Sequence, residues 1–89
     1  MAVRGDATPK IANYLVIRLL ELTLRDPQAP AQRHATTIFL DLVTAFPHAD
    51  VDEFRNGLAM TRSLVGWQGD RHDEMLSLLT EAIGALFRR

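Results

Sequence analysis

The sequence contains no cysteine. This absence excludes disulfide bonds, thiolate catalysis and zinc sites with cysteine ligands, and it favours a reducing compartment, so we expect a cytoplasmic protein. A long apolar run is also missing, because Arg18, Glu21 and Arg25 interrupt the longest one and a membrane-spanning helix needs about 20 apolar residues. Residues 1–6 lack the apolar core and cleavage site of a secretory signal. We therefore expect no membrane segment.

Charge of one sign does not predominate. Lysine and arginine number 10 against 11 aspartate and glutamate, which gives a formal net charge of −1, so no global field attracts nucleic acid or anionic membranes. Hydrophobic residues make up 47% and charged residues 24% of the 89 residues, as in ordinary globular proteins. A chain this short has material for one core. We predict a single domain over residues 1–89, with residues 1–7 disordered.

Apolar residues recur at spacings of three and four in four segments, and this spacing predicts amphipathic helices. We expect the first helix to have Thr8 as its N-cap and Pro9 at its first helical position, and to end near Arg25. The second helix should begin at about residues 29–31. It should stop before Pro47, because proline disfavours helical angles in the preceding residue.

The third predicted helix opens at Asp50, where Glu53 completes a capping box, and ends at Gly66. The fourth runs from about residue 71 to residue 87, with Asp70 as its cap. No segment alternates with the period of a strand. The predicted fold is all-α, a small bundle of about four amphipathic helices.

The first predicted helix has more apolar surface than one bundle face uses. Its polar strip is narrow and consists of Lys10, Arg18, Glu21 and Arg25. Apolar residues cover most of the remaining circumference: Ile11, Leu15, Val16, Leu19, Leu20, Leu22 and Leu24. Two explanations stay open at this point. The helix is central and surrounded by the other three, or its surplus face meets a partner.

We expect the partner to be a second copy, because twofold dimers are the commonest oligomers and a small core gains most from sharing. The candidate partner-binding residues on the first helix are Val16, Leu20 and Leu24. On the third helix they are Met60 and Leu64, which lie nearly opposite its core face. Trp67 is the last candidate, since tryptophan is enriched at binding hot spots, although covering the end of the bundle core is the favoured role for this residue.

The three histidines do not have the spacing of a zinc site, and we predict no metal or cofactor. His34 should be exposed or at a helix margin, and His48 should lie in a turn. His72, followed by Asp73 and Glu74, resembles the phosphoacceptor helix of histidine kinases over these few residues, without that motif's proline. That role would require an exposed histidine. Beyond this short stretch the chain resembles no known family over a useful length.

Catalysis is not predicted. Asp50, Asp52 and Glu53 lie at a helix start, where capping and the helix dipole already explain acidic residues. The sequence favours a non-enzymatic interaction or regulatory protein that acts as a homo-oligomer through apolar helix faces. The alternative is a dimeric DNA-binding transcriptional regulator with a helix-turn-helix at about residues 31–65. The acidic start of its recognition helix would repel phosphate, so nucleic acid is the less favoured partner.

Overall fold

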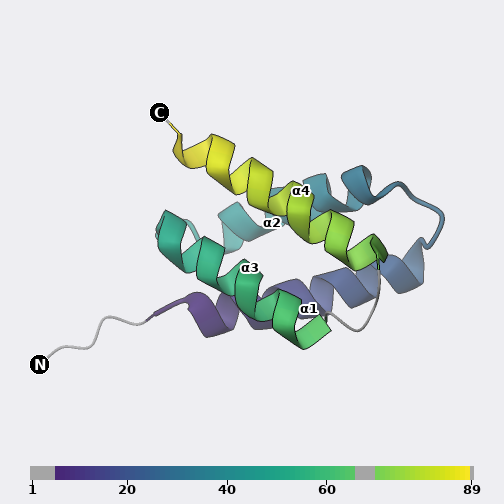
Figure 1. The fold of residues 1–89 in the computed structure, drawn as a ribbon, viewed down its shortest axis with the longest axis horizontal. Coiled ribbons are helices and arrows are strands. Elements are labelled where there is room, and N and C mark those ends of the chain that lie inside the picture. Colours follow the sequence, from purple (N-terminus) through teal and green to yellow (C-terminus); the bar gives the residue numbers. More distant parts are fainter. Residues whose placement is uncertain (1–5, 66–69, 89) are drawn as a thin grey trace, which may run out of the picture.

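The computed structural model describes residues 6–65 and 70–88, and helices are the only regular secondary structure in these ranges. The four helices are α1 (Thr8–Arg25), α2 (Ala31–Ala45), α3 (Val51–Val65) and α4 (Asp70–Phe87) (Figure 1). They pack against one another. The prediction of an all-α fold with four helices is therefore confirmed, and the helix limits agree with the predicted ones to within a few residues.

The helices form two pairs. α1 packs mainly on α3, and α2 packs mainly on α4. Within each pair the two helices run in the same direction, and the directions of the two pairs are opposite (Figure 1). Contacts of α1 with α2 and of α3 with α4 join the pairs. The order of helices around the bundle is thus α1, α2, α4, α3, and the connection from α2 to α3 crosses it diagonally.

The core lies between the two pairs and takes side chains from all four helices. Its most deeply buried members are Ile11, Leu15, Leu19, Ile38, Leu42, Phe54, Met75, Leu76, Leu79 and Ile83. On α1 these residues repeat at spacings of four, which places them on one side of the helix. The other sides of α1 are therefore available for contacts outside the core.

The predicted capping box at the start of α3 is confirmed. The Glu53 amide donates to Asp50 Oδ1 at 2.8 Å, and the Asp50 amide donates to Glu53 Oε1 at 3.0 Å. The second carboxylate oxygen of Glu53 accepts a hydrogen bond from the Ala7 amide at 2.8 Å. One side chain thus begins α3 and also holds the start of α1 beside it.

The predicted N-cap of α1 is wrong by one residue. Ala7 occupies the N-cap position, and Thr8 is already helical. The Thr8 amide donates to Asp6 Oδ1 at 3.0 Å, so the carboxylate of Asp6 satisfies one of the free amides at the start of the helix. The predicted disorder of residues 1–7 concerns mainly residues 1–5, which lie outside the described part of the chain.

α1 and α3 approach each other closely at Gly57. A Cβ atom at this position would lie 2.4 Å from Ile11 Cγ2 and 2.9 Å from Ile11 Cβ, distances that real side chains do not adopt. One turn later the buried Thr61 hydroxyl donates to the Gly57 carbonyl oxygen at 2.8 Å and lies 3.4 Å from the Ala12 carbonyl oxygen. At this contact the Ile11 side chain of α1 therefore lies directly against the backbone of α3. We call the contact of Ile11 and Ala12 with Gly57 and Thr61 the seam.

Two histidines are buried near the end of α1, and the prediction for His34 is wrong. Its Nε2 lies 3.0 Å from the carbonyl oxygen of Asp26, the residue that ends α1, so the ring ties α2 to the connection that precedes it. His72 is also buried, and its Nε2 lies 3.1 Å from Thr23 Oγ1. A buried His72 does not meet the exposure that a phosphoacceptor requires. His48 lies in an exposed turn, as predicted.

Candidate interaction surface

The side of α1 that faces away from the core carries aliphatic side chains. Leu24 is 81% exposed and Ile17 is 60% exposed, while Leu20 between them is half-buried. Their spacing of three and four residues aligns them along the helix. We call Ile17, Leu20 and Leu24 the α1 ridge. Two of its members, Leu20 and Leu24, belong to the predicted partner-binding set.

The third predicted member, Val16, has a different position. Val16 is half-buried and packs against the core residues, so it lies at the flank of the helix contact. Sequence reasoning missed Ile17, which is seven residues before Leu24 and so on nearly the same side of the helix. That spacing of seven was the signal that could have identified it.

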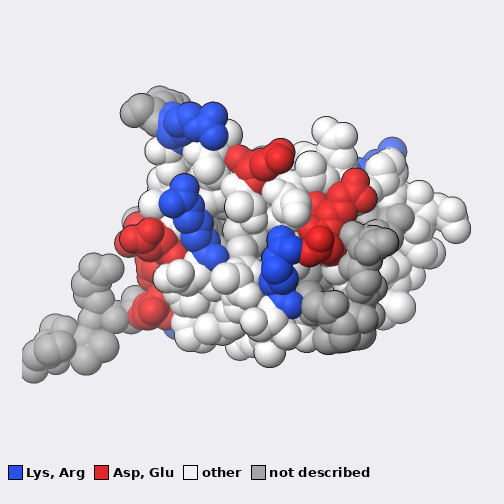
Figure 2. Space-filling model, viewed as in Figure 1, with Lys and Arg blue, Asp and Glu red and all other residues white. Residues whose placement is uncertain are grey.

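Met60 and Leu64 extend the apolar surface from α1 onto α3. Both are exposed, and both lie on the side of α3 away from Phe54 and Leu58. α1 and α3 run in the same general direction, Thr61 lies against Ala12, and Leu64 follows Thr61 by about one helical turn. We call the α1 ridge together with Met60 and Leu64 the α1/α3 surface. In Figure 2 the lower edge of the molecule, where these helices lie, shows few charged side chains.

The polar side of α1 joins it to α2. Arg18 bridges Glu21 at 2.8 Å and Asp41 at 2.6 Å, and the Asp41 contact connects the two helices. Desolvation lowers the pKa of Arg18, but its hydrogen bonds to both carboxylates outweigh this and the net shift is upward. Tyr14 lies beside this cluster, and desolvation followed by the charge of Asp41 raises the pKa of its hydroxyl. This cluster has a structural role between helices.

A groove runs along the outside of the α2 and α4 pair. It has a volume of about 370 Å³, and small or apolar residues form most of it. We call it the α2/α4 groove, and its lining consists of Gln32, Ala35, Thr36, Phe39, Leu78, Glu81, Ala82 and Ala85. Ala35 is buried, whereas Gln32, Thr36, Glu81 and Ala85 are exposed at the rim. The groove is thus apolar within and polar at its edges.

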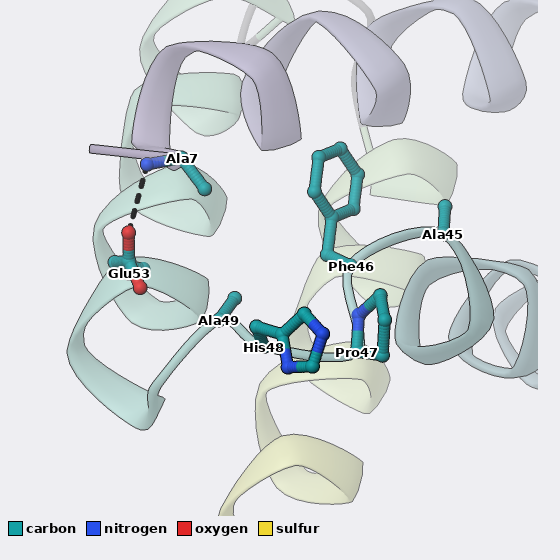
Figure 3. Close-up of a pocket in the computed structure, with 7 residues that line it drawn as sticks. All are labelled: Ala7, Ala45, Phe46, Pro47, His48, Ala49 and Glu53. Carbon is teal, nitrogen blue, oxygen red and sulfur yellow. Dashed lines mark hydrogen bonds between the residues drawn. The ribbon is translucent and has the colours of Figure 1, made fainter. Parts of the chain in front are cut away.

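An open cavity of about 510 Å³ lies where the start of α1, the end of α2 and the start of α3 meet (Figure 3). The Phe46 ring extends toward α1 and meets the Tyr14 ring edge to face, with centroids 5.9 Å apart. Glu53 lines this cavity, but each of its carboxylate oxygens accepts a backbone hydrogen bond. Asp50 and Glu53 therefore serve capping, and His48 is the other titratable side chain in the lining of this cavity.

Across residues 6–65 and 70–88, no three histidine, aspartate or glutamate side chains gather so that they could hold a metal ion. None of the helices in these ranges combines the length and the apolar character needed to cross a membrane. The predicted partner-binding residue Trp67 lies outside the described part of the chain, as do Gly66 and Gly69.

Comparison of the chain with models of known protein families, with curated proteins and with solved structures finds no match. Inferences about function therefore rest on the surfaces of the molecule itself.

Proposed function

We propose that this chain is a non-enzymatic interaction protein that associates with copies of itself, with the α1/α3 surface as the contact. The observation that carries this proposal is the exposure of the α1 ridge, where Leu24 and Ile17 are 81% and 60% exposed. Fully burying a leucine or isoleucine contributes roughly 1.5–3 kcal/mol. Covering two or three such side chains is therefore a substantial driving force for association.

The arrangement of the ridge also supports an interface. Single exposed leucines are ordinary on protein surfaces, but contiguous apolar patches usually mark interaction sites. Here Ile17, Leu20 and Leu24 form a line on one helix, and Met60 and Leu64 continue it on the neighbouring helix. The proposed setting is the cytoplasm, in agreement with the absence of cysteine from the sequence.

The alternative of a DNA-binding regulator receives less support from the packing. In a helix-turn-helix the two helices pack against each other, so that the first positions the second in the major groove. α2 and α3 are not among the packed pairs, since α3 lies on α1 and α4. The start of α3 also carries Asp52 and Glu53, which would face phosphate.

Sedimentation of the full chain over a range of micromolar concentrations tests the proposal. We expect a mass above that of one chain, and we expect Leu24→Glu to weaken association tenfold or more, which corresponds to at least about 1.4 kcal/mol. The matched control is Leu40→Glu. Leu40 is 56% exposed but lies on α2, outside the α1/α3 surface, so this variant should associate like the unmodified chain.

A monomer at every concentration would overturn the proposal. The DNA-binding alternative predicts a shift of duplex DNA at low salt that decreases as salt is raised. We expect no such shift.

A further inference from the structure

We infer that the α1 ridge of one copy docks into the α2/α4 groove of the next copy, so that association is head to tail. This inference rests on the proposed self-association and identifies the surface that receives the ridge. Both surfaces belong to the same chain, and three properties match them: length, shape and charge.

The lengths of ridge and groove agree. Ile17 and Leu24 are seven residues apart, which is about 10.5 Å along a helix at about 1.5 Å per residue. The groove extends along α4 from Leu78 to Ala85, which is also seven residues and about 10.5 Å. The two end side chains of the ridge can therefore enter opposite ends of the groove together.

The shapes are complementary as well. Small side chains, Ala35, Ala82 and Ala85, leave the groove hollow, and the rings and branches of Phe39 and Leu78 provide apolar contact. Helices pack by placing the side chains of one into the hollow between side chains of another. A third helix laid between the parallel helices α2 and α4 would do this and would cover the ridge.

Charges at the edges also match. Lys10 and Arg25 flank the ridge on α1, and within the described residues neither has an ion-pair partner. Glu81 lies at the rim of the groove and likewise has no ion-pair partner there. With Ile17 and Leu24 at the two ends of the groove, Glu81 lies within about one helical turn of Arg25. Lys10 lies beyond the groove and Glu21 is already paired with Arg18, so Arg25 is the cation that Glu81 can meet.

Pairing two ridges by a twofold axis is less favourable. Lys10 lies seven residues before Ile17 and Arg25 eight residues after it. An antiparallel pairing centred on Leu20, the middle of the ridge, places Arg25 of one copy level with Leu15 of the other and so brings no like charges together, whereas a parallel pairing opposes each cation to its own copy. Like charges in contact are unfavourable, and a ridge offers no hollow to another ridge.

Head-to-tail contact has a consequence for assembly size. The ridge is on α1 and the groove is on α2 and α4, so a dimer formed this way keeps one free ridge and one free groove. Such heterologous contacts continue until a ring closes or a filament grows. We therefore expect species larger than a dimer as concentration rises.

A complementation experiment tests the inference. Leu24→Glu removes the ridge and leaves the groove intact, whereas Ala85→Trp fills the groove and leaves the ridge intact. Ala85 is exposed, so the second variant should fold, and Thr36→Trp on the opposite wall provides an independent groove block. Circular dichroism and thermal unfolding confirm that each variant is folded before sedimentation.

The expected result is that each variant alone is monomeric where the unmodified chain associates, while an equimolar mixture of Leu24→Glu and Ala85→Trp forms a 1:1 dimer that does not grow. If both tryptophan variants associate like the unmodified chain while Leu24→Glu does not, the groove is not the receiving surface and this inference fails, although the proposed self-association stands. A mixture that forms no dimer also overturns it. A monomeric unmodified chain overturns the proposed function itself.

Discussion

The two helix pairs use small residues with opposite results. In the α1 and α3 pair, Gly57 lies directly under Ile11, and the helices approach until no Cβ atom would fit. In the α2 and α4 pair, Ala35 and Ala82 lie beside Phe39 and Leu78, and a groove of about 370 Å³ remains outside the contact. A small residue thus allows α1 and α3 to pack closely, whereas small residues leave a groove beside the contact of α2 with α4.

The difference follows from where each small residue lies relative to the helix contact. Gly57 is on the line between the axes of α1 and α3, so its missing side chain lets the partner helix move inward. Ala82 and Ala85 lie on the side of α4 that lines the groove, where Ala82 is half-buried and Ala85 is exposed. The α1 and α3 pair therefore exposes the α1 ridge, and the α2 and α4 pair exposes the α2/α4 groove.

The largest loss of stability should come from a substitution at Gly57, where α1 and α3 are in close contact. Gly57→Ala places a methyl group 2.4 Å from Ile11 Cγ2, and Ile11 is fully buried, so the helices must separate. We expect a loss of about 1–3 kcal/mol, which exceeds the gain of up to about 1 kcal/mol from better helix propensity. Urea unfolding measures it. An unchanged or increased stability would mean that the seam is looser than this geometry.

A smaller loss of stability should follow when the hydrogen bonds that Glu53 accepts at the starts of α1 and α3 are weakened. Glu53→Gln keeps the size of the side chain but replaces one of its two accepting oxygens with an amide nitrogen that cannot accept. Either the Ala7 or the Asp50 amide therefore loses its acceptor, and the remaining hydrogen bond loses its charge. We expect a loss of about 1 kcal/mol. Asp52→Asn is the matched control, because Asp52 is exposed in the same helical turn, and it should change stability by only a few tenths of a kcal/mol. Equal effects in both variants would contradict a specific role for Glu53.

A gain of stability is expected when a glycine is replaced in the α2 and α4 pair. Gly84 is in α4, and no atom outside its local helix lies within 4 Å of the position that a Cβ would take. Gly84→Ala should therefore stabilise the protein by roughly 0.5–1 kcal/mol through helix propensity alone. The same substitution at positions 57 and 84 thus separates packing from propensity. A loss of stability at position 84 would remove that distinction.

The smallest effect on stability concerns Tyr14, beside the contact between α1 and α2, and it depends on pH. Desolvation, and then the charge of Asp41, raise the pKa of Tyr14 above its ordinary value of 10.0. The neutral hydroxyl is therefore favoured in the folded state, and its contribution is present below about pH 10 and is lost as the pH rises further. Urea midpoints at pH 8 and pH 11 should differ less for Tyr14→Phe than for the unmodified chain. An equal difference in the two proteins would exclude Tyr14 as a source of the pH dependence of stability.

Part of the candidate site could be predicted from residue spacing. Leu20, Leu24, Met60 and Leu64 lie at or near the surface, on the sides of their helices to which periodicity assigns them. Val16 was predicted to lie on the partner-binding side in place of Ile17, although the spacing of seven residues between Ile17 and Leu24 favoured Ile17. Val16 and Ile17 are adjacent in the chain, and the position of α3 beside α1 decides which of them is covered.

The helix limits and the capping box were within reach of the sequence alone, because the bonds that begin and end a helix join residues close together in the chain. Pro47 and the pair Asp50 and Glu53 are examples. Only the tertiary structure decided the parallel pairing of α1 with α3, the burial of His34 and the groove beside Ala82. Each of these depends on how helices distant in sequence fit their side chains together, and local periodicity says which side of a helix is apolar without saying what will cover it.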